Sequence, residues 1–414
     1  MKIGLVLQCF DPSRGGLEQW TYNFARGLID RGHDVHVVAE RFGPSASALP
    51  ITAHALDGAG RRFHFARASQ ARLMSIAPDI IHDMGYGWYC DVFHPHIGSW
   101  YSLWRRRLES LSPLRRFFKR GFDEFSPRVR QLRDLVDRQY ADRGQIMIAL
   151  SHAIADDFRQ LHDVPDERIR VVRNGVDIDY FSPQDRIHRR ETARRSLGIG
   201  TKETTAVIVA QNLRLKGVPA LLAATARLAR QGRPLRLLVV GGKNVRGWKL
   251  KAWRMGVSSR VDFVGMVDDP RPYYAAADYF VMPTLYDACS LVALEAAAAG
   301  LPIITSRCNG AAEMFSDGRD CLLLDRPTDL DELTAKMLQL SDEKKRSRLA
   351  LAARTTAENN TFEANVDHIA AIYEQIIDQR SRLTRVDKSS EDRSRMVEAI
   401  RRFIPSETTG RKSA

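Results

Sequence analysis

Two acidic residues of this chain, Asp287 and Glu295, have a spacing that suits the binding of one polar ligand. They lie eight positions apart, a little over two helical turns, so an acid in a loop and an acid in the following helix face the same ligand. Between them the expected helix begins, and there the backbone N–H groups of Ser290, Leu291 and Val292 attract an anion. A phosphate flanked by two carboxylates that accept hydrogen bonds from hydroxyls describes a nucleotide sugar. The simpler alternative is a surface helix with two solvated acids.

A second candidate site follows the first apolar segment, where Gly15 and Gly16 precede a helical pattern. Paired glycines let the backbone approach a ligand closely at the start of a helix. A tight turn without a ligand would use the same pair. The third glycine of a dinucleotide fingerprint is missing, so a Rossmann dehydrogenase is disfavoured.

Two further segments offer groups for the same kind of ligand. Arg214 and Lys216 lie just before Gly217 on an expected strand-to-helix loop, where a diphosphate would need positive countercharge. Either residue could instead be an ordinary surface cation. The segment 261–266 predicts a strand that ends in a turn at Gly265, and the backbone of such a turn can recognise the edge of a base.

The elements that must position these residues follow from the hydrophobic pattern, which alternates strand-like runs with helical patterns twice. The first set has strands expected at 3–7, 35–39 and up to 82, with a helix at 17–31. The second set has strands at 205–210, 235–240, 261–264 and 279–282, with a helix at 217–230. Such alternation predicts an α/β protein with two doubly wound, parallel sheets that face a central cleft.

Composition limits the class of protein. A chain of 414 residues exceeds what one core supports, so two domains are expected, and 44% apolar residues is ordinary for a globular protein. No run of eighteen apolar residues and no signal-peptide pattern are present, which favours the cytoplasm. The five cysteines are scattered and lack metal-ligand spacing, so we expect neither a disulfide nor zinc.

A net charge of +13 predicts an anionic partner, and one basic segment narrows the choice. Residues 104–120 interleave cations with aromatic and aliphatic side chains, as in a helix that lies in a membrane interface. Pro113 should kink or split this helix. The alternative is an amphipathic helix packed on its own domain. The residues expected to meet the lipid are Trp104, Arg105, Arg106, Arg115, Arg116, Phe117 and Phe118.

Taken together, these segments resemble glycosyltransferase family 4, retaining enzymes of the GT-B fold, over roughly residues 1–379. The acids match the family's acidic-x7-acidic signature, with Asp287 in place of the usual Glu. The family's first acid contacts the donor sugar and its second, here Glu295, holds the ribose hydroxyls. The usual Arg five residues before Lys216 is Gln211 here, which leaves Arg214 as the expected substitute.

The resemblance adds two further site residues. Family members often hold a histidine near the donor's sugar and phosphate, and in the segment 90–99 His96 is the better match, with His94 as the alternative. Arg173, beside the Asn174-Gly175 turn of the linker-like segment, joins the residues expected to bind the donor. The formal Asp177-x-Asp179 pattern falls in this segment, so we expect no catalytic metal and no cofactor.

The expected domains follow the same resemblance. Residues 1–175 should form a Rossmann-like domain on the acceptor side, and residues 176–360 a Rossmann-like domain that binds the nucleotide sugar. Residues 361–379 should form a terminal helix that crosses back to the N-terminal domain. The remainder, 380–414, should be a basic and mostly disordered tail, with a short amphipathic helix near 396–404.

The four segments look most similar to lipopolysaccharide core glucosyltransferases that act on a heptose. This implies transfer of a hexose, with UDP-glucose as the expected donor, to a lipid-linked glycan at the inner leaflet of the cytoplasmic membrane, where the enzyme would be peripheral. A UDP-sugar epimerase of the same fold is one alternative, although its acid and base residues are not recognisable here. A nucleic-acid binder is the other, and it would leave the acidic signature unexplained.

Overall fold

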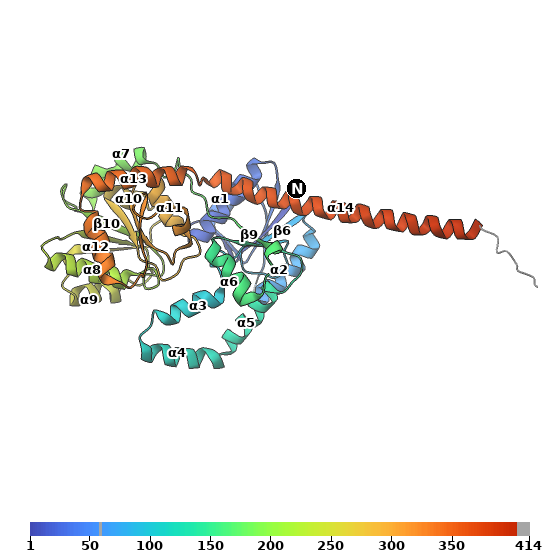
Figure 1. Cartoon of the computed structure of the whole chain (residues 1–414), viewed down its shortest axis with the longest axis horizontal. Coiled ribbons are helices and arrows are strands. Elements are labelled where there is room, and N and C mark those ends of the chain that lie inside the picture. Colours follow the sequence, from blue (N-terminus) through green and yellow to red (C-terminus); the bar gives the residue numbers. More distant parts are fainter. Residues whose placement is uncertain (58–59, 404–414) are drawn as a thin grey trace, which may run out of the picture. The chain divides into compact units, whose positions relative to one another are not determined.

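The computed structural model describes the backbone of residues 1–57 and 60–403 and the side chains of residues 1–57 and 60–382. The chain separates into two compact units, Met1–His368 and Ile369–Ala414. The first unit holds two parallel sheets with helices around them, and Figure 1 labels their elements. Within the described part of the second unit, the chain continues the long helix α14 (Phe362–Phe403).

The N-terminal sheet has the strand order β5-β3-β1-β6-β7-β8-β9, and all its pairings are parallel. Its strands are β1 (Lys2–Val6), β3 (Asp34–Ala39), β5 (Thr52–Ala55), β6 (Ile80–Asp83), β7 (Val92–Phe93), β8 (Ile146–Ala149) and β9 (Ile169–Val171). Its helices are α1 (Gly16–Asp30), α2 (Arg62–Ile76), α3 (Trp100–Glu109), α4 (Pro113–Phe125), α5 (Pro127–Tyr140) and α6 (His152–His162). The short strands β2 (Cys9–Phe10) and β4 (Arg41–Phe42) pair separately.

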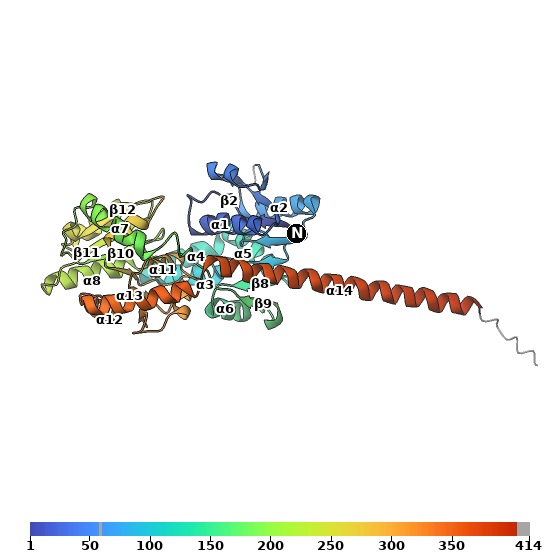
Figure 2. The same cartoon turned by 90° about the horizontal axis from the view of Figure 1, so that it is seen from above.

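The C-terminal sheet has the order β12-β11-β10-β13-β14-β15 and is also parallel. Its strands are β10 (Thr205–Val209), β11 (Arg236–Val240), β12 (Val261–Gly265), β13 (Tyr279–Met282), β14 (Ile303–Ser306) and β15 (Cys321–Leu324). Its helices are α7 (Pro183–Ser196), α8 (Val218–Arg230), α9 (Arg246–Arg254), α10 (Arg271–Ala276), α11 (Leu291–Ala298), α12 (Leu330–Gln339) and α13 (Glu343–Glu358). Figure 2 shows the same elements from above.

The strand order explains where a ligand site can form. In each sheet the chain first builds outward on one side and then crosses to the other, so β1 and β10 lie at the points where the order reverses. Ligands of parallel α/β sheets bind outside the carboxyl ends of the strands at such points. The segments after β1, β7, β10 and β13 carry Gly15, His96, Lys216 and Asp287. The prediction of two doubly wound, Rossmann-like sheets is confirmed.

Two segments take regular structure that composition alone did not predict. The charged residues 184–195 lie in α7, whose N-cap Ser182 accepts a hydrogen bond from the Asp185 backbone N–H. Helix α14 continues to Phe403, so the expectation of a mostly disordered chain from residue 380 is wrong up to that residue. Residues 380–403 contain no proline or glycine, and their Arg, Lys and Glu are good helix formers. The rest of the expected tail, and the end of the short helix expected near 396–404, lie outside the described residues.

The basic segment, residues 104–120, lies in two helices, α3 and α4. Pro113 splits it as expected: α3 ends at Glu109 and α4 begins at the proline, which fits the first turn of a helix. Among the described helices, none is long and apolar enough to span a membrane.

Candidate functional site

A cavity of about 430 Å³ lies at the carboxyl ends of both sheets. The first sheet's side contributes Gly15, Gly16 and Trp20, from the loop before α1 and from α1 itself. The second sheet's side contributes the residue after β10, the segment after β12 and the first two turns of α11. Residues from these three parts that line the cavity include Gln211, Met266, Asp268, Leu291, Val292 and Glu295.

The start of α11 is held in place by hydrogen bonds. Ser290 is its N-cap, and the Ser290 hydroxyl accepts a hydrogen bond from the Ala293 N–H at 3.4 Å. The backbone N–H of Ser290 donates to Oδ1 of buried Asn309 at 3.2 Å. Leu291 and Val292 then line the cavity, and the N–H groups of a first helical turn have no partner inside their own helix. This fixed, positive helix end therefore lies at the cavity, as the sequence predicted for an anion site.

Glu295 lies one turn further along α11 and also lines the cavity. Its Oε2 accepts a hydrogen bond from the Tyr274 hydroxyl at 2.9 Å. Burial raises the pKa of Glu295 to about 7, while the Tyr274 hydrogen bond opposes this and the charge of Asp269 adds to it. Burial disfavours the charged form of this carboxylate. Hydrogen bonds from a ligand, such as those from two neighbouring hydroxyls, would stabilise that charged form.

Lys216 and Asp287 form an ion pair that joins the loops after β10 and β13. The Lys216 Nζ lies 2.6 Å from Asp287 Oδ2 and donates a second hydrogen bond to the Tyr286 carbonyl at 3.1 Å. Both side chains are largely buried, with 19% and 17% exposure. The structure therefore brings together two residues that the sequence singled out separately, beside the cavity rather than among its lining residues.

Arg214 is not brought to the cavity. Its guanidinium lies over the Trp248 ring, 5.7 Å from the centroid, and the side chain is exposed. Gln211 points to the cavity instead, and its amide donates to the Arg14 carbonyl at 2.9 Å. The position at which the family usually has Arg is thus the one at the ligand cavity, and the turn after β10 directs Arg214 away from it.

His96 packs behind the cavity wall. Its ring centroid lies 4.4 Å from that of Trp20, which lines the cavity, and 4.2 Å from that of His94. Burial lowers the pKa of His96 to about 3, so its imidazole is neutral at pH 7. Nε2 of His96 and both ring nitrogens of His94 are buried without a hydrogen-bond partner in the described structure. His94 is fully enclosed, whereas His96 is only partly buried.

The other expected donor residues have mixed positions. Arg173 pairs with Glu313 at 3.4 Å, and that carboxylate also accepts the first backbone N–H groups of α6. Gly265 ends β12 with a φ of +89°, and the residue after it lines the cavity, so the glycine turn is where a base edge would be read. Arg173 thus acts at the contact between α6 and the C-terminal sheet's loops.

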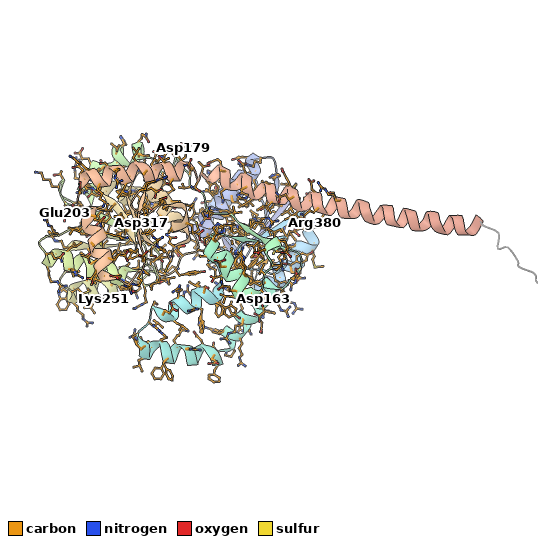
Figure 3. All side chains as sticks on the ribbon, in the orientation of Figure 1. Asp163, Asp179, Glu203, Lys251, Asp317 and Arg380 are labelled. Carbon is orange, nitrogen blue, oxygen red and sulfur yellow. The ribbon has the colours of Figure 1, made fainter. Side chains whose placement is uncertain are left out.

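In the basic segment, the exposed aromatic face is on α4. Leu114, Phe117, Phe118, Phe122 and Phe125 follow helical spacing on one side, and their exposures are 66% to 80%. Figure 3 shows side chains that project outward from this helix. Phe122 and Phe125 extend the face that the sequence had assigned to Phe117 and Phe118.

The other predicted membrane residues are partly engaged within the segment. The Trp104 indole N–H donates to Asp123 at 2.9 Å, between α3 and α4, so Trp104 faces inward. Arg105 and Arg106 both pair with Glu109, at 3.2 and 3.0 Å. Arg116 donates to two carbonyls at the end of α3, whereas Arg115 is exposed.

Sequence reasoning missed four residues that either line the cavity or hold its lining residues in place. Tyr274 orients Glu295, Asn309 fixes the start of α11, Trp20 separates His96 from the cavity, and Gln211 lines it. Each lies on a different element from its partner, and the apolar pattern of α1 and α10 marks Trp20 and Tyr274 only as core residues. Among the described residues, no group of three or more His, Cys, Asp or Glu is arranged to hold a metal ion.

Two family models match this chain, one in each half. The family model described as "Glycosyltransferase Family 4" matches residues 14–180, and that described as "Glycosyl transferases group 1" matches residues 204–343.

Relatives with known names are also glycosyltransferases. A D-inositol 3-phosphate glycosyltransferase of Corynebacterium urealyticum is 28% identical over 291 residues, 67% of this chain and 67% of the relative. One from Corynebacterium diphtheriae is 24% identical over 400 residues, 87% and 89% of the two chains.

Among solved structures, WaaG, a glycosyltransferase involved in lipopolysaccharide biosynthesis, superposes with a TM-score of 0.76 at 22% identity, covering 90% of this chain and 99% of WaaG. Anabaena HepE in complex with UDP-glucose has a TM-score of 0.67 at 20% identity, covering 91% and 99%. The two Rossmann-like sheets are therefore those of the GT-B fold.

The pKa of Glu295 gives a test that needs no ligand. Because its pKa of about 7 in the folded protein exceeds the ordinary 4.5, the carboxylate destabilises the fold as pH rises through this range. Glu295→Gln should therefore unfold at the same temperature as the wild type at pH 4.5 and at a higher one at pH 8. At pH 8 the free energy of unfolding of this variant should exceed that of the wild type by at most about 3 kcal/mol.

Thermal unfolding at both pH values measures this, with Glu124→Gln on exposed α4 as the matched control. Equal effects of the two variants at pH 8 would show that Glu295 is not strained by burial.

Proposed function

We propose that this chain, which belongs to glycosyltransferase family 4 and has the GT-B fold, transfers glucose from UDP-glucose to a lipid-linked glycan such as the lipopolysaccharide core, at a membrane surface. Transfer of a sugar from a nucleotide donor is the activity of its family. We propose in addition that the donor is UDP-glucose, that the acceptor is linked to a lipid, and that the reaction takes place at a membrane. The observation that carries the proposal is that Glu295 and the start of α11 line the same cavity as Gly15 and Gly16.

The donor fits this cavity by the chemistry of its lining. The ribose hydroxyls donate to Glu295, the first turn of α11 faces the diphosphate, and the backbone near Gly265 reads the base. Gly15 and Gly16 line the opposite side, where they present backbone and no side chain to the donor. HepE, which has the same fold, was crystallised with UDP-glucose, and this supports a uridine nucleotide.

The residues beside the cavity act on the reacting groups. The bond between the anomeric carbon and the phosphate oxygen breaks while a bond to the acceptor oxygen forms on the same face, and the leaving phosphate takes the acceptor's proton. Lys216 offsets the negative charge that grows on the diphosphate, together with the helix end. Asp287 holds the Lys216 ammonium in place and contacts the sugar. The neutral imidazole of His96 offers a hydrogen bond to the sugar without adding charge.

The acceptor surface follows from α4. Exposing its five apolar residues to water costs free energy, so this face is suited to a partner that covers it. The cations Arg115 and Arg120 lie on the same helix. Aromatic rings next to cations suit the interface of an anionic lipid layer, with rings toward the acyl boundary and cations toward headgroups. A lipid-linked acceptor would be met at this surface.

A soluble inositol phosphate is the second candidate acceptor, favoured by the names of the sequence relatives. It would need no membrane and would leave the apolar face of α4 without a role. Epimerisation would need no acceptor at all, and nucleic-acid binding would leave Glu295 and the helix end unused.

One assay separates these activities. UDP release from UDP-glucose should depend on a heptose-terminated lipopolysaccharide acceptor and be much slower with inositol 3-phosphate or without an acceptor. Lys216→Ala should lower kcat about a hundredfold, the usual effect of removing one charge-stabilising donor. Because the two residues form one ion pair, Asp287→Ala should lower kcat by less in the Lys216→Ala background than in the wild type.

Arg214→Ala is the matched cation control and should keep most activity, because its guanidinium lies on Trp248. Release that proceeds equally without any acceptor, or multiplicative losses from the two pair variants, would contradict this mechanism.

The membrane surface has its own test. The protein should sediment with vesicles that contain phosphatidylglycerol, and less so at high salt, because exposed charges are screened. Arg115→Ser with Arg120→Ser should weaken binding by about 2 kcal/mol, at about 1 kcal/mol for each cation.

Phe118→Ser with Phe122→Ser should weaken binding to all vesicles. Leu351→Ser, which removes an apolar residue that is 74% exposed on α13, is the control and should change nothing. Equal binding of the wild type to neutral and anionic vesicles would reject the electrostatic part of this account.

A further inference from the structure

A second pocket, of about 380 Å³, lies at the N-terminal ends of α2 and α5, apart from the donor cavity. Three of its lining residues are arginines, and no acidic residue is among those lining it. The pocket is lined by Gly60, Arg61, Arg62, Phe63, Arg128, Gln131 and Leu132. We refer to it as the arginine pocket.

Both helices present their positive ends here without the usual compensation. Arg61 is the N-cap of α2 and provides no side-chain hydrogen bond to the first turn. The N-cap of α5, Ser126, provides none either, and neither first turn contains an acid. Arginines at a helix N-terminus are unfavourable because their charge opposes the dipole, and the preferred N-caps are Ser, Thr, Asp and Asn. An anion bound in the pocket would compensate both helix ends.

The arginines themselves lack acidic partners. Arg61 and Arg128 form no ion pair within the described chain, and the Arg62 guanidinium lies 5.8 Å from the Tyr86 ring centroid. Other arginines of this protein commonly pair, as Arg159 does with Asp156 and Asp166. The positive potential reaches α3 as well, where burial and the charge of Arg62 lower the pKa of Arg107.

A second, small cavity borders the arginine pocket. A narrow cavity of about 20 Å³ shares Arg62 and Leu132 with it. The same cavity is also lined by Pro95 and Ile97, the two chain neighbours of His96. The arginine pocket and the segment around His96 are therefore neighbours within the N-terminal Rossmann-like part of the chain.

We propose that the arginine pocket binds a phosphomonoester group of the acceptor, an inference that rests on the proposed function. A phosphomonoester carries close to two negative charges and three oxygens, which match several guanidinium forks and two helix ends. A carboxylate has one charge and would leave most of these groups unused. The volume exceeds that of a phosphate, so part of the sugar that carries it would enter as well.

The test is a calorimetric titration of inorganic phosphate into the full chain at constant ionic strength, with saturating UDP present to occupy the donor cavity. Arg61→Gln with Arg128→Gln should weaken phosphate binding at least tenfold. Both side chains are exposed, so the fold should tolerate the change. Arg115→Gln with Arg120→Gln on α4 removes the same charge elsewhere and should leave phosphate affinity unchanged.

Equal phosphate affinity of the wild type and both double variants would overturn the proposal. A chain that binds phosphate in this arginine-dependent way but shows no binding of UDP would refute the donor site and leave the phosphate site standing. The two failures are thereby distinguishable.

The source of the phosphate is found with two further probes, inositol 3-phosphate and vesicles of phosphatidic acid. If the pocket variant weakens binding only of inositol 3-phosphate, the group belongs to a soluble acceptor. If it weakens binding to phosphatidic acid vesicles and spares phosphatidylglycerol vesicles of equal charge, the group belongs to a lipid. Loss of neither would contradict a phosphomonoester site.

Discussion

The fixed start of α11 is the constraint on which the functional geometry depends. The Asn309 amide accepts N–H groups from Ser290 and from Ala311, and it donates to Thr305 at the end of β14. Because the helix start is tied to the neighbouring strand, it cannot shift to follow a ligand, and its N–H groups keep one direction. Glu295 lies on the same short helix, so its position is fixed in the same way. In the proposed function, an anion and two hydroxyls would be recognised by one rigid element, and such preorganisation lowers the cost of binding.

Close approach between loops completes the cavity. A side chain at Gly15 would meet the Gln211 amide at 2.5 Å, and one at Gly16 would meet Leu291 at 3.3 Å. The two glycines therefore let the loops of the two sheets approach closely, and a side chain at either position would displace Gln211 or Leu291. Lys216 and Asp287 tie two loops of the C-terminal sheet in a similar way. Removing one partner of such a largely buried pair leaves the other charge poorly solvated, so its effect combines stability and chemistry.

Much of the fold and the centre of the candidate site could be predicted from the sequence. Apolar runs such as 279–282 became strands with nearly the expected limits, because fully buried parallel strands have an unmistakable pattern. Asp287 and Glu295 stood out because they lie on either side of the expected start of a helix. Arg214 and Gln211 could not be told apart, since the direction of a side chain on a turn depends on backbone angles that composition does not reveal. Trp104 looked like a membrane anchor, yet its partner Asp123 lies on another helix. The arginine pocket joins residues 61 and 128, which are distant in sequence.

The most direct test of the account is a calorimetric titration of UDP into the wild type and Glu295→Ala at pH 8, with Glu124→Ala as a control of equal charge change. The account predicts that Glu295→Ala binds UDP about 10- to 150-fold more weakly, the loss expected when a charged hydrogen-bond acceptor worth about 1.5–3 kcal/mol is removed. Glu124→Ala should bind UDP like the wild type. Equal UDP affinity of all three proteins would contradict the assignment of this cavity to a nucleotide sugar.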